Sequence, residues 1–236
     1  MRKFLEPDPV HTGVGKWRIA LFNALFSCTE IALFLFVLFP VETFQRVKAM
    51  WVAISKQTIT PELIKQYAAI EPVIDQLILR TRPKEQVKAI EALLKNDFPK
   101  DKITVHSDSE VLNRFNLTHI HFKEMDERAF HLKQTHPDLC VSMSTHSQAS
   151  AQAAKRHHLD YVLFGHLFKT TSKPGLPPRT QEEIDSVLTA DIPVIALGGI
   201  NFDTLSEVPQ GFSGIAAISL FAHHDLHTLS SLKEGE

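Results

Sequence analysis

Short apolar, β-branched runs alternate with amphipathic stretches along most of the chain. From residue 50 onward this alternation repeats, which is typical of βα units whose strands form a parallel sheet. The apolar runs predict eight strands, at 51–54, 73–79, 103–105, 117–121, 139–143, 161–164, 194–197 and 214–218. Eight such units within about 185 residues predict an α/β fold, a (β/α)8 TIM barrel that forms a single domain over residues 50–236.

Turn and cap signals separate the predicted strands. Residues 60–62 (Thr-Pro-Glu) place a cap residue, a first-turn proline and an acid ahead of apolar positions, as at a helix N-terminus. Residues 147–157 are rich in alanine and predict a helix that packs closely on a sheet, and residues 180–188 open with a capping-box pattern. The one long polar gap, 169–179, contains three prolines and a glycine, and a gap of that length in a tight barrel predicts a functional loop.

The N-terminal extension, residues 1–49, does not follow this pattern. Residues 19–39 are nearly continuously apolar and long enough to span a bilayer. Glu30 interrupts the run, however, and one acid at bilayer depth costs about 2 kcal/mol or more. Three interpretations stay open: an appended or wrongly translated leader with Met50 as the true start, a membrane anchor, or a helix packed on the barrel. Membrane contact is expected only through residues 19–39.

Composition and charge limit the kinds of partner that the chain is expected to bind. A chain of 236 residues that is 44% hydrophobic buries a full core as one domain. The net charge of -2 comes from scattered charges without a basic stripe, which favours a small-molecule partner over nucleic acid. Cys28 and Cys140 form no CxxC pair, so neither a disulfide scaffold nor a zinc knuckle is expected, and a reducing cytoplasm fits.

Catalytic groups of such barrels lie where strands end and βα loops begin. Gly198 and Gly199 follow the seventh predicted strand, and Ile218 and Ser219 end the eighth. The loops after these two strands often bind phosphate, because glycines let backbone N–H groups approach the anion. We therefore expect a phosphate site there, while the simpler interpretation is a tight strand-to-helix turn.

The sixth predicted strand ends in a histidine. His166 is followed by Thr170, Ser172 and Lys173 in the long polar loop. An imidazole at a strand end can move a proton near neutral pH, while hydroxyl and ammonium groups bind polar or anionic substrates. This pattern predicts a catalytic His166 with Thr170, Ser172 and Lys173 in substrate binding; a buried structural histidine is the alternative.

Two further strand ends carry candidate substrate-binding residues. Ser144 and His146 follow the fifth strand, where hydroxyls serve equally well as helix caps. Arg80 and Arg82 lie two residues apart after the second strand, so on extended backbone both point to one face and can grip a carboxylate or phosphate. A pair of solvated charges is the alternative. A metal site is not expected, because His119 and His121 of the fourth strand lack a third ligand at defined spacing.

These motifs together resemble the thiamine phosphate synthase superfamily and, within it, the TenI-like thiazole tautomerase branch. The specific segments are 143–175 (MSTHSQASAQAAKRHHLDYVLFGHLFKTTSKPG), 192–201 (IPVIALGGIN) and 211–219 (GFSGIAAIS). Synthases typically carry the sequence Phe-Gly-Pro at the end of the sixth strand. This chain has Phe164-Gly165-His166 there, which resembles the tautomerases. Synthases also carry an Asn-Asp-Arg segment that helps to hold magnesium, in place of His106-Ser107-Asp108. By this resemblance Asp126 matches one of the metal ligands of the synthases, and the second carboxylate ligand is missing from this chain.

The resemblance implies an isomerase, a thiazole tautomerase of thiamine biosynthesis that converts a thiazole phosphate carboxylate to its aromatic form. In that reaction His166 is the acid–base group and no cofactor is required. A thiamine phosphate synthase, which needs Mg²⁺ and transfers a pyrimidine, is the alternative, as is a non-catalytic ligand-binding regulatory barrel. The expected partner is a phosphorylated thiazole, and the expected assembly is a homodimer.

Overall fold

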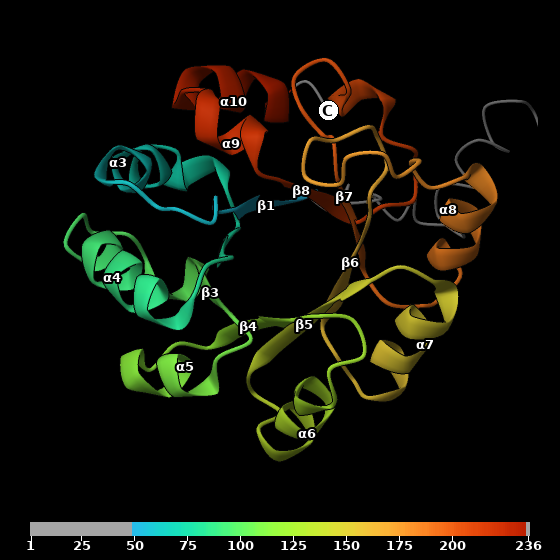
Figure 1. Ribbon diagram of the computed structural model, residues 1–236, viewed down its shortest axis with the longest axis horizontal. Coiled ribbons are helices and arrows are strands. Elements are labelled where there is room, and N and C mark those ends of the chain that lie inside the picture. Colours follow the sequence, from blue (N-terminus) through green and yellow to red (C-terminus); the bar gives the residue numbers. More distant parts are fainter. Residues whose placement is uncertain (1–48, 235–236) are drawn as a thin grey trace, which may run out of the picture. The chain divides into compact units, whose positions relative to one another are not determined.

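The predicted (β/α)8 barrel is confirmed in the computed structural model, which describes residues 49–234. Parallel strands pair in chain order, and β1 closes the barrel against β8 (Figure 1). The strands are β1 Met50–Ile54, β2 Gln76–Leu79, β3 Ile103–His106, β4 His119–Phe122, β5 Cys140–Thr145, β6 Tyr161–Gly165, β7 Val194–Leu197 and β8 Gly214–Ala217. The apolar run 19–39 and its three interpretations lie outside the described residues.

Helices lie outside the ring of strands (Figure 1). They are α3 Pro61–Ala69, α4 Pro83–Leu94, α5 Ser109–Phe115, α6 Glu127–Thr135, α7 Gln148–Arg156, α8 Gln181–Leu188, α9 Ser219–His223 and α10 Leu226–Glu234. Short 3-10 turns are η1 Glu71–Val73, η2 Lys100–Lys102 and η3 Leu205–Glu207. Within residues 49–234, every helix is too short or too polar to cross a bilayer.

The predicted helix starts are confirmed by their caps. Thr60 Oγ1 accepts a hydrogen bond from the N–H of Leu63 at the start of α3, and Ser147 caps α7 in the same way. At α8 the capping box is complete, because Thr180 and Glu183 satisfy each other's backbone N–H groups. These caps fix the points at which the loops before α3, α7 and α8 end.

Alternate residues of each strand face the helices or the barrel interior. The helix-facing set is apolar and forms the main core, as in Leu77 and Leu79 of β2. The barrel interior has an apolar side and a polar side. Apolar residues such as Val52, Leu163 and Ile195 fill the side built by β6, β7, β8 and β1. Polar residues fill the side built by β2 to β5, where buried Thr104 Oγ1 donates to Gln76 Oε1 at 2.7 Å.

Seven of the eight predicted strands differ from the observed ones by one to three residues at one end or both. The second strand begins at Gln76 rather than at residue 73, because residues 71–73 form η1 around Pro72 and the Asp75 carboxylate accepts the N–H of Trp51 at 2.7 Å. The fourth runs over 119–122 rather than 117–121. The eighth ends at Ala217, one residue early, because Ile218 is the N-cap of α9. The last shift moves Ile218 from the strand to the mouth of the barrel.

Candidate active site

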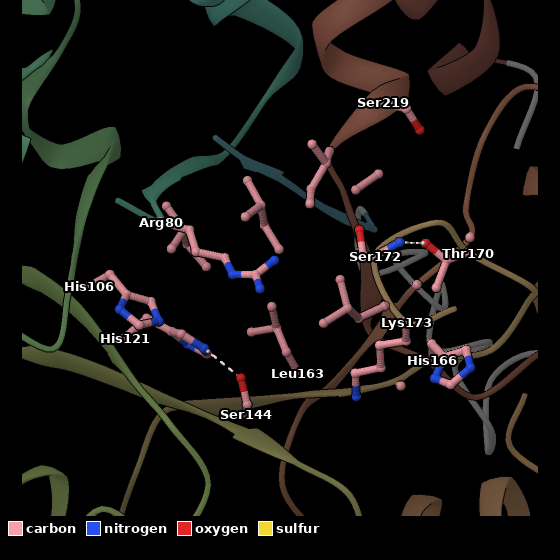
Figure 2. A pocket seen from close by; sticks show the side chains of 18 of the residues that line it. Arg80, His106, His121, Ser144, Leu163, His166, Thr170, Ser172, Lys173 and Ser219 are labelled. Carbon is pink, nitrogen blue, oxygen red and sulfur yellow. Dashed lines mark hydrogen bonds between the residues drawn. The ribbon is translucent and has the colours of Figure 1, made fainter. Parts of the chain in front are cut away.

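A pocket of about 720 Å³ opens at the carboxyl ends of the strands, where the predicted site residues were expected to meet (Figure 2). Arg80 extends into it after β2, with Ser172 and Lys173 on the other side of the view. Nearly all residues predicted for the site line this pocket: Arg80, Ser144, His146, His166, Thr170, Ser172, Lys173, Gly198, Gly199, Ile218 and Ser219.

Arg82 is the exception, and its expected alignment with Arg80 is wrong. The backbone turns directly after β2, because the N–H groups of Arg80 and Thr81 bond to carbonyl oxygens two residues earlier. Arg82 then becomes the N-cap of α4. Its side chain is 85% exposed and lies 3.5 Å from Glu85. The extended geometry that puts residues two apart on one face does not continue past Leu79.

His166 follows β6 and lies in the pocket wall, only 5% exposed. Its Nε2 lies 3.3 Å from the carbonyl oxygen of Leu176, in the loop 169–179. Because a carbonyl oxygen only accepts, Nε2 carries the hydrogen, and Nδ1 of the neutral ring is then an unprotonated acceptor. The protein encloses this nitrogen in the pocket wall and leaves it unpaired among the described residues.

Glycines bring the ends of β6 and β7 into close contact. Gly199 has a φ of 72°, and a Cβ built on it would lie 2.6 Å from the carbonyl oxygen of Phe168. A side chain there would collide with Phe168 and Lys169, so the loop after β6 would have to move. Gly198 and Gly199 thus line one side of the expected phosphate site, and Ser219 at the start of α9 lines another. The first N–H groups of a helix lack intrahelical acceptors, which suits an anion.

A buried histidine orients Ser144. His121 Nδ1 lies 2.8 Å from Ser142 Oγ, and its Nε2 lies 2.9 Å from Ser144 Oγ. Burial lowers the pKa of His121 to about 3, with smaller contributions from His106 and Arg80. The ring is therefore neutral at pH 7, so that one nitrogen donates and the other accepts. This arrangement holds the Ser144 hydroxyl at the pocket surface (Figure 2).

The pocket is rich in cations. Lys56, Arg80, Lys123 and Lys173 line it, whereas Glu124 is the one carboxylate that the described residues contribute to its wall. Charge of this sign favours a phosphate or carboxylate ligand.

A magnesium–pyrophosphate site, which the synthase resemblance implies, does not fit these residues. Asp126 caps α6 and binds the Arg128 guanidinium at 2.6 Å, and that guanidinium holds the pKa of Asp126 below its usual range. Asp108 caps α5 and accepts two backbone N–H groups. Over residues 49–234, no three His, Cys, Asp or Glu side chains converge for a metal ion. Mg²⁺ is usually held by one or two carboxylates together with substrate phosphates, and here both candidate carboxylates already have partners.

Several pocket residues were not selected from the sequence as site residues. These are Lys56, His106, Lys123, Glu124 and His223. Each follows or ends a strand except His223, which ends α9. The strand-end rule includes His106, Lys123 and Glu124 among its candidates. Nothing in the sequence singles out Glu124, however, because its contact with His146 joins two different loops.

Comparisons with known proteins identify a family and several relatives for the barrel. A sequence profile of the family described as thiamine monophosphate synthase matches residues 53–221. The thiamine-phosphate synthase of Lysinibacillus sphaericus is 33% identical over 119 residues, which cover 49% of this chain and 56% of that protein. The thiamine-phosphate synthase of Chlorobium phaeovibrioides is 40% identical over 91 residues, covering 37% and 44%. The chain thus spans about half the length of these curated relatives.

Solved structures share the fold over a longer stretch. The thiamine phosphate pyrophosphorylase of Pyrococcus furiosus superposes with a TM-score of 0.62 at 21% identity, covering 80% of this chain and 98% of that one. The protein of the same title from Bacteroides thetaiotaomicron gives 0.55 at 25% identity, covering 79% and 98%. At 21% identity, the similarity to the Pyrococcus furiosus protein supports the barrel fold alone.

Proposed function

The chain belongs to the thiamine monophosphate synthase family, and from this premise we propose that it is a thiazole tautomerase. The substrate is a thiazole phosphate carboxylate with an exocyclic double bond, and the product is the aromatic thiazole. The superfamily placement predicted from the sequence is confirmed by the profile match. The choice of branch is our proposal, and it depends on the side chains of the pocket.

One observation carries the proposal. His166 lies in the wall of a cationic pocket whose one carboxylate among the described residues, Glu124, is already bound to His146. A proton transfer needs such an imidazole. Displacement of pyrophosphate instead uses a divalent ion held by carboxylates and substrate phosphates, and Asp108 and Asp126 are already engaged as helix caps.

The reaction balances within the substrate and one acid–base group. A C–H bond of the ring breaks, its electron pair moves into the ring as the exocyclic double bond opens, and a new C–H bond forms at the exocyclic carbon. Substrate and product are isomers, so no electrons and no leaving group enter or leave. His166 accepts the proton and returns one.

The remaining residues bind and orient the substrate. Gly199 and Ser219 hold the phosphate, as the resemblance implies, and Arg80 with Lys173 faces its carboxylate across the pocket. The neutral His121 keeps the Ser144 hydroxyl directed at the ring. Closure of the loop 169–179 over His166 excludes water, because Leu176 already contacts the imidazole there.

The experiment is an absorbance assay on the purified full chain. Addition of the unaromatised thiazole phosphate is expected to give the aromatic absorbance band at a rate well above that in buffer, with and without chelator. A rate equal to that in buffer, while the ligand still binds, would end the proposal and leave a ligand-binding barrel.

A second candidate is the synthase, and the relatives' printed names favour it over the tautomerase. It predicts Mg²⁺-dependent release of pyrophosphate when a pyrimidine diphosphate and thiazole phosphate are supplied together. A coupled pyrophosphate assay on the same preparation separates the two candidates, since the tautomerase releases none.

A further inference from the structure

Three consecutive βα loops place a carboxylate, an imidazole and an ammonium group in one line. Glu124 follows β4, His146 follows β5 and Lys173 follows β6. Glu124 Oε2 lies 2.6 Å from His146 Nδ1, and His146 Nε2 lies 3.1 Å from Lys173 Nζ. All three side chains line the pocket.

The hydrogen positions in this line follow from the donors and acceptors. An ammonium group only donates, so His146 Nε2 accepts from Lys173, and Nδ1 then carries the hydrogen that it donates to Glu124. Glu124 is held in place, because its Oε1 accepts the N–H of His146 at 2.7 Å and the hydroxyl of Ser150 at 2.6 Å. Burial raises the pKa of Glu124, but the bonds from Ser150 and His146 outweigh it, so the carboxylate stays charged.

Opposing forces act on the charge of Lys173. Burial lowers its pKa, and so do the guanidinium groups of Arg179, ahead of α8, and Arg80, after β2. Glu124 acts in the opposite direction and favours the ammonium form. These groups and His146 interact with Lys173, and the titratable side chains of Lys56, Lys123 and His166 line the same pocket.

We propose that Glu124 and His146 form a proton relay that makes Lys173 a second acid–base group of the pocket. A proton passes from Nζ to His146 Nε2, giving a neutral amine and an imidazolium whose Nδ1–H is bound by Glu124. The line carries the same net charge before and after, which avoids placing a new charge in a poorly solvated site. Glu124 and His146 are positioning residues, and Lys173 is the group that meets the substrate.

The role in turnover rests on the proposed function. The isomerisation removes a proton from one carbon and adds one at another; in place of His166 acting at both carbons, Lys173 acts at one of them. The protonation states of both are restored by exchange with water. The ionisation of Lys173 is a property of the protein alone, and it is tested without any thiazole.

The first experiment measures Lys173 by acetic anhydride labelling of the full chain at a series of pH values, with mass spectrometry of each lysine. Lys169, exposed on the same loop, is the internal reference. In Glu124→Gln the labelling midpoint of Lys173 is expected to fall by about half a pH unit or more, which raises its labelling about threefold at fixed pH below the midpoint. Asp126→Asn, which removes a carboxylate two residues away, is the matched control and leaves the midpoint unchanged.

An unchanged midpoint in Glu124→Gln overturns the relay. So does a higher labelling rate at every pH with the same midpoint, since that result means that the pair only limits access to Lys173.

The second experiment uses His146→Gln in the absorbance assay. Glutamine still accepts a hydrogen bond from Lys173 but cannot take up its proton, so kcat is expected to fall at least about tenfold with little change in KM. Turnover equal to that of the unchanged chain overturns the relay. If the unchanged chain itself shows no turnover, the proposed function fails, and the labelling midpoint alone decides whether Glu124 controls Lys173.

Discussion

A side chain on Gly198 would collide with His166. The φ of Gly198 is 100°, and a Cβ built there would lie 2.2 Å from the Cβ and 2.6 Å from the Cα of His166. Next to this contact the backbones of the two loops are joined, because Leu167 and Phe168 donate to the carbonyl oxygens of Leu197 and Gly198, each at 3.0 Å. The end of β7 therefore fixes the position of the imidazole at the end of β6.

Gly198→Ala is expected to displace His166. The strained φ and the collision together cost roughly 1–3 kcal/mol of stability, and misplacement of the acid–base group lowers kcat by on the order of tenfold to a hundredfold. Thermal unfolding and the absorbance assay measure both effects.

Gly175→Ala is the matched control. Gly175 also has a positive φ, 77°, but a Cβ built there meets no atom within 4 Å. It should retain kcat. If both variants lose the same activity, strain alone explains the loss and the contact with His166 does not matter.

His121 predicts a pH dependence of stability. The pKa of His121 is about 3 in the folded protein and near 6.5 when unfolded. Between these values the unfolded chain binds the extra proton, so the free energy of unfolding falls as pH falls below about 6.5. The slope from this one group reaches about 1.4 kcal/mol per pH unit. The lowered pKa values of His106 and His119 act in the same direction.

Urea unfolding at pH 7.5 and pH 5 checks this prediction. His121→Asn keeps a polar group near Ser142 and Ser144 but does not titrate. The variant should be less stable at pH 7.5 and should lose less stability on acidification than the unchanged chain. Equal losses for both proteins would contradict a neutral, buried His121.

Substitution of the two arginines after β2 should affect KM differently. Arg80 lines the pocket, whereas Arg82 is exposed beside Glu85. A charged hydrogen bond contributes about 1.5–3 kcal/mol, so Arg80→Met is expected to raise KM on the order of tenfold to a hundredfold. Arg82→Met should leave KM within about twofold. Similar KM values for both variants would show that Arg80 does not hold the substrate.

The sequence predicts the barrel well, because each strand is a short apolar run with turn signals on either side. The sequence predicts strand and helix boundaries less well where a local turn interrupts the apolar pattern. Pro72 converts the expected start of the second strand into η1, and Pro83 begins α4 so early that Arg82 leaves the pocket.

The residues of the candidate site likewise fall into those that the sequence can indicate and those that it cannot. His166, Gly199 and Ser219 can be selected from the sequence, because each follows a strand or ends one, and that position alone brings it to the pocket. The line from Glu124 through His146 to Lys173 cannot be selected in this way. It depends on the side-chain directions of three separate loops, which no spacing within one segment encodes.

The central claim is that the imidazole of His166 moves the proton, and His166→Asn tests it most directly. We expect kcat for aromatisation of the thiazole phosphate to fall by about 10²- to 10⁴-fold, while the dissociation constant measured by calorimetry stays within about threefold. The melting temperature serves as the check on folding. A folded variant that binds the substrate and keeps kcat within tenfold of the unchanged chain would contradict the account.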